Sequence, residues 1–181
     1  MTWLSAVTNA DQLVRAWVVT HRFPAADGLM WLLSAITEGG KLWLALAAIV
    51  TIRRGRPGPF TTMALTLLLS AILTEDVLKP SVGRERPFVL TPNILVIGGK
   101  PFDSSFPSGH AASSVAAALI LGSAVPRLRF LWWTLAFSVA YSRVYLGVHY
   151  PLDVLGGGLV GATCAAVVLA ASTRWRIFKP T

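Results

Sequence analysis

The chain has few charged residues and a single cysteine. Asp, Glu, Lys and Arg make up only 13% of its 181 residues, while hydrophobic residues make up 54%. A soluble domain carries about 25% charged residues, so this chain has too little polar material to cover a surface that faces water. A lipid bilayer is therefore the solvent that the composition favours. The lone Cys164 excludes an internal disulfide and a cysteine cluster for zinc, and its apolar neighbours favour a packing role.

The chain also lacks the interleaved aromatic and basic residues that bind single-stranded nucleic acid. Its formal net charge of +8 therefore needs another explanation, and we expect no nucleic-acid partner. Many of the basic residues stand in short clusters between apolar runs, which is typical of the signals that orient membrane proteins.

The N-terminal stretch lacks the order of a cleaved signal peptide, in which a basic segment, an apolar core and a small-residue cleavage site follow one another. Asp11, Arg15 and Arg22 interrupt its apolar residues, so we expect the mature protein to keep it. Met1–Phe23 is predicted to form an amphipathic helix in the membrane interface, with a spanning helix as the alternative. A short apolar segment, Leu29–Ile36, follows.

Five later apolar runs predict the membrane-spanning part of the fold. They cover roughly Lys41–Ile52, Phe60–Leu78, His110–Val125, Phe130–Leu146 and Leu152–Ser172. The first is shorter than the roughly 20 residues of a straight span, so it either extends backward through Glu38 or crosses a thinned region. The last contains Gly157 and Gly161, whose spacing is typical of close helix packing, here within the chain rather than between copies.

The predicted fold class is therefore all-α, a polytopic membrane helical bundle with about five to six transmembrane helices. We expect a single domain over residues 1–181. Residues 1–38 form its N-terminal interfacial segment, and residues 39–173 form the helical core that carries the site.

The basic residues predict how the bundle is oriented. If the loops alternate between the two sides of the membrane, one side collects eight basic residues, namely Arg53, Arg54, Arg56, Arg127, Arg129, Arg174, Arg176 and Lys179. The positive-inside rule makes that side cytoplasmic. The segment Lys79–Pro107, which we expect to be a long non-helical loop, then shares the outer side with the turn Arg143–Pro151. A loop of this length is usually functional or disordered, and the chemical residues that flank it favour a function.

Three cations on the predicted outer face suit a highly charged anion. Lys79 and Arg86 belong to the long loop, and Arg143 belongs to the later turn. Arginine holds two phosphate oxygens through its planar fork, and lysine adds a point charge. Each cation taken alone is equally well explained as a side chain that reaches the interface from a helix end.

Pro107-Ser108-Gly109-His110 opens the third apolar run. A helix N-terminus offers free backbone N–H groups and the positive end of the helix dipole to an anion. Gly109 allows a ligand to approach the backbone closely, and Ser108 either caps the helix or donates to a phosphate oxygen. His110 places a titratable ring beside this predicted anion site, which an ordinary helix cap does not need.

His149 and Asp153 stand four residues apart around Pro151. If a helix begins near Pro151, the Asp153 carboxylate lies one turn from the ring and holds one ring N–H, which leaves the other nitrogen free to attack. A structural His–Asp pair is the alternative. Two histidines and an aspartate also suit zinc, but the surrounding cations would repel it, so we expect neither a metal nor another cofactor.

Together the three segments resemble the signature of the type 2 phosphatidic acid phosphatase (PAP2) family. The segments are Lys79-x6-Arg86-Pro87, Pro107-Ser108-Gly109-His110 and Ser142-Arg143-x5-His149-x3-Asp153, in the family's order and spacing. The wider superfamily includes soluble bacterial acid phosphatases and vanadium haloperoxidases, and the hydropathy here matches the membrane-bound bacterial branch.

The resemblance implies a role for each matching residue. His149 would be the nucleophile that forms a phosphohistidine, Asp153 would orient it, and His110 would be the general acid. The phosphoryl oxygens would be bound by Lys79, Arg86, Ser108, Gly109 and Arg143. With the orientation given by the positive-inside rule, we expect a multi-pass protein of the bacterial inner membrane with the site on the periplasmic side.

We therefore predict a metal-independent membrane lipid phosphatase or diphosphatase whose partners are its lipid phosphate substrate and the membrane lipids. Undecaprenyl diphosphate or another isoprenyl diphosphate is favoured over phosphatidylglycerol phosphate, phosphatidic acid and lipid A. An anion transporter is one rival, although the charges gather at one face. An inactive scaffold and a haloperoxidase are the others. The oligomeric state stays open.

Four charged residues beside the first motif receive no catalytic role. Arg84 and Glu85 stand between the motif residues, and Glu75 and Asp76 precede them. Glu75 is four residues before Lys79, so we expect a local ion pair between the two.

Overall fold

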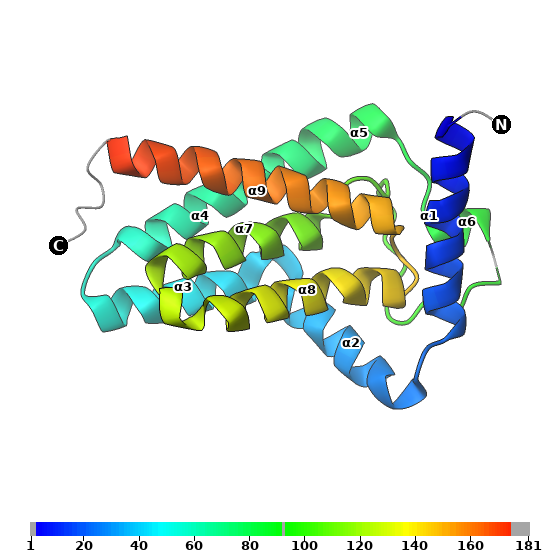
Figure 1. The fold of residues 1–181 in the computed structure, drawn as a ribbon, viewed down its shortest axis with the longest axis horizontal. Helices are drawn as coiled ribbons and strands as arrows, with labels where there is room; N and C mark the ends of the chain where they lie inside the picture. The colour runs from blue at the N-terminus through cyan, green and yellow to red at the C-terminus, as the bar shows by residue number, and fades with distance from the viewer. Residues whose placement is uncertain (1–2, 92, 175–181) are drawn as a thin grey trace.

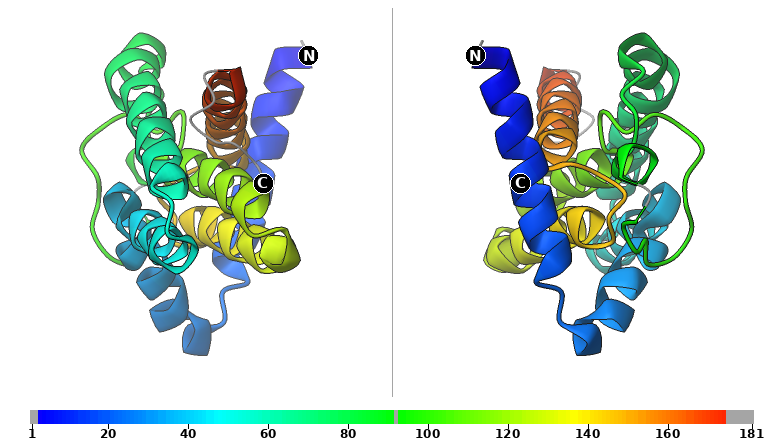
Figure 2. Two further views of the ribbon diagram at one scale, coloured as in Figure 1. Left: turned by 90° about the vertical axis from the view of Figure 1, so that its left-hand side faces the viewer. Right: turned by 90° about the vertical axis from the view of Figure 1, so that its right-hand side faces the viewer.

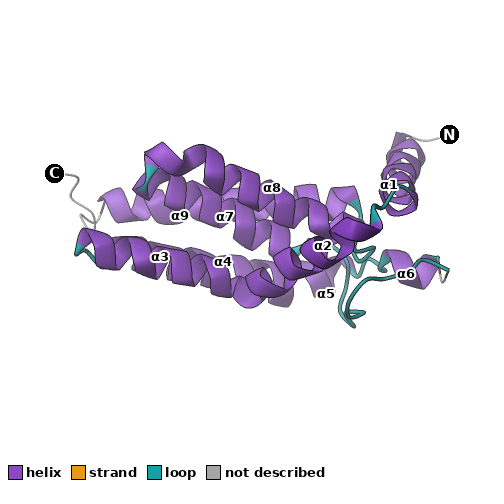
Figure 3. Cartoon of the chain, turned by 90° about the horizontal axis from the view of Figure 1, so that it is seen from below, coloured by secondary structure: helices purple, strands orange, loops and turns teal. Residues whose placement is uncertain are grey.

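The computed structural model describes residues 3–91 and 93–174. The described residues form helices joined by loops, with no strand among them (Figure 3), which confirms the all-α prediction. The α-helices are α1 (Trp3–Thr20), α2 (Pro24–Thr37), α3 (Lys41–Arg54), α4 (Gly58–Ala71), α5 (Lys79–Val82), α6 (Pro87–Leu90), α7 (Gly109–Ala124), α8 (Arg129–Tyr145) and α9 (Pro151–Arg174).

Helix α7 is the centre of the bundle. It packs against α4, α8 and α9 (Figures 1 and 2), and small residues fill most of its length, so its neighbours approach it closely from several sides. Ala112, Ala116 and Ala117 are completely buried. Around them the core is completed by larger side chains, among them Trp43 and Met63.

Two glycines bring α9 against α7. A Cβ atom built on Gly157 would lie 2.2 Å from the backbone oxygen of Ser108, and one on Gly161 would lie 2.0 Å from that of Ala112. Both distances are far below van der Waals contact, so only glycine fits at these two positions. The predicted close packing within the chain is therefore present, and it brings the start of α9 beside the start of α7.

Within the described part of the chain, three helical segments are long and apolar enough to cross a membrane: Pro24–Arg54, Gly58–Leu90 and Pro151–Ser172. The first joins α2 to α3 through a 3₁₀ turn, η1 (Glu38–Gly40), in which Gly39 and Gly40 have φ values of +62° and +75°. The predicted short run Lys41–Ile52 thus extends backward through Glu38, as one of the two alternatives expected. Helix α7 is apolar but has only 16 residues.

The prediction that Lys79–Pro107 has no helix was wrong at its beginning and at Pro87–Leu90. Helix α4 continues through a π-helical turn, η2 (Ile72–Leu78), into α5. Pro80 has no N–H, and its ring clashes with the carbonyl four residues back in a regular α-helix, so the wider π turn lets the helix pass this proline. Gly83, with a φ of +62°, then ends it. Most of the remaining segment is a loop, as expected.

The two ends of the bundle carry different residues. The α3–α4 and α7–α8 connections and the C-terminal end of α9 lie together, on the left of Figure 1. Six of the predicted basic residues belong to this end, namely Arg53, Arg54, Arg56, Arg127, Arg129 and Arg174. Arg176 and Lys179 lie outside the described residues. The end of α8 and the starts of α7 and α9 meet at the opposite end, near α5.

Helix α1 crosses this opposite end, transverse to α8 and α9 (Figures 1 and 2). It contacts both helices and buries Asp11 and Arg15, while Leu13 and Trp17 are 69% and 61% exposed. An amphipathic helix at one end of a bundle suits the predicted interfacial segment, whose place in a membrane stays a prediction. Met1 and Thr2 lie outside the described residues.

Candidate active site

The end of the bundle beside α1 contains a cavity of about 720 Å³. Six of the eight residues predicted for the site line it, and they are Lys79, Arg86, Gly109, His110, Arg143 and His149. Segments that are far apart in the sequence supply these side chains: α5, the loop before α6, the first turn of α7, the last turn of α8 and the α8–α9 loop. The two other predicted residues, Ser108 and Asp153, are fully buried, and Asp153 faces the lining residue His149.

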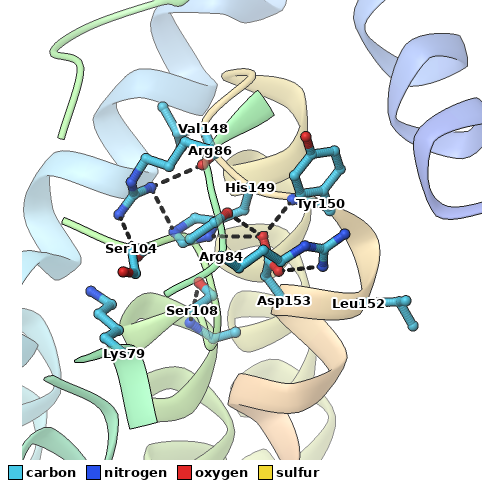
Figure 4. A network of polar contacts seen from close by, with 12 residues as sticks. Lys79, Arg84, Arg86, Ser104, Ser108, Val148, His149, Tyr150, Leu152 and Asp153 are labelled. Carbon is cyan, nitrogen blue, oxygen red and sulfur yellow. Dashed lines mark hydrogen bonds and ion pairs between the residues drawn. The ribbon is translucent and has the colours of Figure 1, made fainter. Parts of the chain in front are cut away.

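The ring of His149 lies between the carboxylate of Asp153 and the guanidinium of Arg86 (Figure 4). Its Nδ1 is 3.4 Å from Oδ2 of Asp153 and has no closer partner among the described residues. Its Nε2 is 3.3 Å from Nη1 of Arg86. Arginine has only donors, so Nε2 accepts and the ring proton belongs on Nδ1, which faces the carboxylate. This tautomer keeps a lone pair on Nε2, the nitrogen on the side of Arg86.

Burial, with a smaller contribution from the positive charges of Arg143 and Arg86, lowers the pKa of His149 from 6.5 to about 4, against the opposing effect of Asp153. The imidazole is therefore neutral at pH 7. A neutral ring is the form that carries an attacking lone pair.

Arg86 is held on every side. Its Nε donates to the backbone oxygen of Asp103 and its Nη2 donates to Oδ1 of the same residue, each at 2.8 Å. Its Nη1 donates to the backbone oxygen of Val148 at 2.9 Å and points to His149. The guanidinium plane is thus fixed beside the imidazole before any substrate binds.

Lys79 lies between two carboxylates. Its ammonium group donates to Oε2 of Glu75 at 2.5 Å and to Oδ2 of Asp103, so the predicted Glu75–Lys79 ion pair is confirmed. Partial burial would raise the pKa of Asp103, but hydrogen bonds and charge from Lys79 and Arg86 lower it to about 2. The Asp103 carboxylate bridges the two cations, as two oxygens of a phosphoryl group would.

On the other side of the cavity, Ser34 of α2 connects Arg143 to His110. Its hydroxyl accepts from Nη1 of Arg143, and its backbone oxygen accepts from Nε2 of His110 at 3.2 Å. The Nε of Arg143 is buried without a hydrogen-bond partner among the described residues. A buried donor of this kind suits an anionic oxygen.

Ser108 acts as the N-cap of α7. Its hydroxyl accepts from the backbone N–H of Ala111 at 3.4 Å, and its own N–H donates to the backbone oxygen of Asp153 at 2.9 Å. This second bond ties the beginning of α7 to the beginning of α9. Gly109 and His110, the first residues of α7, face the cavity with the positive end of the helix.

Asp153 receives four groups at its two oxygens. Oδ2 accepts from the Ser105 hydroxyl and from the backbone N–H of Tyr150, the latter at 2.8 Å, and it faces His149. Oδ1 accepts from Nη1 of Arg84 at 2.6 Å. The carboxylate is therefore ionised and fixed in one orientation by its donors.

Five contributors to the site were missing from the sequence prediction, and they are Asp11, Ser34, Arg84, Asp103 and Ser105. Two signals were available: Arg84 stands two residues from a motif arginine, and Asp103-Ser104-Ser105 is a polar cluster just before Pro107. Ser34 and Asp11 gave no such signal. Among the described residues, no group of three or more His, Cys, Asp or Glu side chains is arranged to hold a metal ion.

Comparison with known proteins matches the sequence to one family. The sequence pattern of the PAP2 superfamily matches residues 59–177, which is more than half of the chain. The chain belongs to the PAP2 superfamily. This PAP2 chain is 33% identical to an undecaprenyl-diphosphatase of Sulfolobus acidocaldarius over 145 residues, which are 78% of the chain and 68% of that relative.

Two further relatives of this PAP2 chain are informative. A decaprenylphosphoryl-5-phosphoribose phosphatase of Mycobacterium tuberculosis is 40% identical over 135 residues, or 70% of this chain and 69% of the relative. The crystal structure of a transmembrane PAP2-type phosphatidylglycerolphosphate phosphatase from Bacillus subtilis superposes with a TM-score of 0.76 at 26% identity, covering 96% of this chain and 90% of that one. The predicted membrane-bound lipid phosphatase of the PAP2 family is thereby confirmed.

Proposed function

We propose that this PAP2 protein removes a phosphoryl group from a membrane lipid by transferring it to Nε2 of His149. One observation carries the proposal: the ring presents Nε2 to Arg86 inside the cavity while its Nδ1 faces Asp153. Lys79 and Arg143 line the same cavity. An imidazole held in this tautomer directs its lone pair to the place where fixed cations gather an anion.

In the first step, the lone pair of Nε2 attacks phosphorus and the bond from phosphorus to the lipid oxygen breaks. That oxygen takes a proton from His110, the general acid, whose cationic form the negative charge of the bound phosphate would stabilise. The three remaining phosphoryl oxygens are bound by Lys79, Arg86 and Arg143, and the N–H groups at the start of α7 add to this site. Asp153 balances the positive charge of the phosphorylated ring.

In the second step, water attacks phosphorus and the bond from phosphorus to Nε2 breaks. His110, now neutral, takes the proton of the attacking water, and inorganic phosphate leaves with the ring restored. The contact of Ser108 with a phosphoryl oxygen stays a prediction, because its hydroxyl is buried and already accepts from Ala111. It holds the beginning of α7 in place in either case.

We favour an isoprenyl diphosphate or phosphate as the substrate class. Two of the relatives described above are named for polyprenyl substrates. Next to the cations, the cavity is lined by apolar side chains, among them Trp31, Ile97 and Phe102. This lining suits a lipid whose phosphate is attached directly to a hydrocarbon chain, without a large polar headgroup. Phosphatidylglycerol phosphate is the second candidate, because the superposed Bacillus subtilis protein is named for it.

A panel of lipid phosphates tests both the proposed nucleophile and the proposed substrate class. The purified full-length protein in detergent is given an isoprenyl diphosphate, an isoprenyl phosphate, phosphatidylglycerol phosphate, phosphatidic acid and lipid A, with and without EDTA, and released phosphate is measured. We expect the highest kcat/KM for the isoprenyl compounds, activity that persists in EDTA, and no turnover by His149→Ala. Preference for a glycerophospholipid overturns the substrate class, and turnover by His149→Ala overturns the nucleophile.

A transporter that binds the same anion is the rival function. The described cations of the cavity gather at one end of the bundle, and the opposite end carries a separate group of basic residues. This favours a surface site over a path through the helices. In reconstituted vesicles, we expect phosphate release and no movement of intact lipid phosphate between leaflets. Transfer between leaflets without hydrolysis would support the rival.

We further propose that the cavity opens on the periplasmic side of a bacterial inner membrane, because the basic end of the bundle suits the cytoplasmic side. The buried Cys164 is first replaced by alanine. Phe102→Cys then places a thiol at the exposed rim of the cavity, and Leu128→Cys places one at the opposite end. A membrane-impermeant maleimide added to intact spheroplasts should label the first variant and spare the second. The reverse pattern would invert the orientation.

A further inference from the structure

Arg84 joins Asp153 to a second buried carboxylate that the proposed chemistry leaves unused. Its Nη1 donates to Oδ1 of Asp153 at 2.6 Å, and its Nη2 donates to Oδ2 of Asp11 at 2.5 Å. Both carboxylates are completely buried, whereas the Arg84 side chain is 23% exposed. The guanidinium also lies 4.1 Å from the centre of the Tyr150 ring. The arginine is therefore fixed from three sides.

Asp11 comes from the transverse helix α1 and has a second partner. Its Oδ1 accepts from the backbone N–H of Leu152 at 2.8 Å, in the first turn of α9. Asp153 belongs to the same turn, so Asp11 holds the backbone that carries Asp153 and, through Arg84, also holds its carboxylate. One side chain of α1 thereby fixes both the position and the orientation of this group.

The three side chains also have a defined total charge. Asp11 and Asp153 are negative and Arg84 is positive, so the cluster carries one net negative charge. If Asp11 were neutral, Arg84 would cancel the charge of Asp153, and the ring of His149 would face no net counter-charge. If Arg84 were neutral, two uncompensated carboxylates would lie buried together, which is costly.

We infer that Asp11 and Arg84 are positioning residues for the proposed phosphoryl transfer, because they orient Asp153 and hold its surroundings at the single negative charge that a cationic His149 ring requires. This inference rests on the proposed function. The ring becomes cationic when Nε2 bonds to phosphorus while Nδ1 keeps its proton. A cluster with one negative charge balances that cation without overcompensating it.

Other charged and titratable groups also face His149 and Asp153, and the test leaves them unchanged. Those around His149 are His110 of α7, Arg143 of α8 and Arg86 of the loop before α6. Near Asp153 are Tyr150 and, from α1, Arg15, whose charge acts on Tyr150. Variants that change only Asp11 and Arg84 therefore isolate the charge of the cluster.

Four variants separate charge from packing. Asp11→Asn brings the net charge of the cluster to zero, Arg84→Gln makes it minus two, and the double variant restores minus one. Arg84→Lys keeps the charge and removes the planar fork. Full-length protein in detergent micelles is labelled in the histidine rings, and each ring is titrated by NMR. The chain has only three histidines, so replacing His21 or His110 assigns the signals.

We expect opposite shifts in the titration of His149. Arg84→Gln should raise its pKa by about one unit from the wild-type value, because the extra negative charge favours the imidazolium. Asp11→Asn should lower it, and the double variant should return it to near the wild-type value. With the substrate that the wild-type protein hydrolyses, kcat should fall about 10-fold to 100-fold in both single variants. KM should change little, and the double variant should be faster than Arg84→Gln.

A purely structural role gives a different result. The inference would be overturned if the losses of kcat in the two single variants added up in the double variant and the titration of His149 were unchanged in all three variants. If Arg84→Gln does not fold, Arg84→Lys and the double variant still report on orientation and charge. The NMR arm needs no turnover, so a wild-type protein that hydrolyses no lipid phosphate would overturn the proposed function while the titrations still decide whether the cluster sets the charge at His149.

Discussion

Nη1 of Arg86 lies 3.3 Å from Nε2 of His149 and donates to it. The arginine therefore covers the lone pair that we propose as the nucleophile. Its other donors are directed to the backbone of Val148 and to Asp103. A phosphoryl oxygen that takes over the Nη1 donor would bind to the protein and uncover the nucleophile in the same movement.

Replacing Arg86 by lysine should therefore lower kcat/KM by about 100-fold, although the charge is retained. A lysine is a point charge that cannot hold Asp103, Val148 and a phosphoryl oxygen together in one plane. Steady-state phosphate release measures the loss. Arg127→Lys, at the opposite end of the bundle, is the matched control and should keep wild-type activity. Wild-type kinetics in Arg86→Lys would mean that charge alone suffices.

His110→Ala should reduce kcat by about 10²-fold to 10⁴-fold for an alkyl phosphate. The loss should be smaller for a diphosphate or an aryl phosphate, since these leaving groups need less help from a proton donor. Rates for a series of leaving groups give the comparison, with the exposed His21→Ala as a control. An equal loss for every leaving group would remove His110 from the role of general acid.

The acid limb of the pH profile should reflect the low pKa of His149. Burial and the neighbouring arginines lower that pKa from 6.5 to about 4, so kcat/KM should stay high at pH 5 and fall only near pH 4, once the titration of the substrate is taken into account. Loss of activity near pH 6.5 would mean an unperturbed imidazole.

The same shift has a consequence for stability. The folded-state pKa of His149 lies below the value of 6.5 for the unfolded chain, so the unfolded chain binds more protons between these two values. The free energy of unfolding should therefore decrease as the pH falls from 6.5 towards 4, with no further contribution from this group below that. His149→Gln should flatten this part of a denaturation series. An unchanged slope in the variant would assign the effect to other groups.

Gly161→Ala should destabilise the fold by about 1–3 kcal/mol, because its Cβ would lie 2.0 Å from the backbone oxygen of Ala112. It should also displace the start of α7 from that of α9 and lower activity. Gly158→Ala is the matched control in the same helix, since its Cβ would meet the nearest atom, a Val115 methyl group, at 3.5 Å. Thermal unfolding in detergent should show a lower Tm for the first variant only, and equal Tm values would contradict the packing argument.

Local patterns in the sequence predicted much of the fold. Apolar runs bounded by Pro, Gly and Arg predicted five helices that the structure contains as α3, α4, α7, α8 and α9. The continuation of α4 through Pro80 was not predicted, because proline usually ends a helix. The π-helical turn that makes the continuation possible depends on packing in the folded chain rather than on residue type.

Motif spacing likewise predicted the lining of the cavity, because Lys79, Arg86, His110, Arg143 and His149 carry rare residue types at characteristic distances. Residues that act on these side chains from outside the motifs could not be found in this way. Asp103 had a weak local signal, whereas Ser34 and Asp11 reach the site from helices far away in the sequence.

The sequence by itself determined that this chain belongs in a bilayer and which side chains suit phosphate, since hydropathy and residue chemistry are local properties. Only the tertiary structure decided which nitrogen of His149 is free and which groups hold Asp153. These outcomes depend on contacts between distant segments, such as that of Asp11 with Leu152, which stand 141 residues apart. Such contacts form only when the helices pack. The lack of a side chain at Gly157 and Gly161 allows α9 to pack closely against α7.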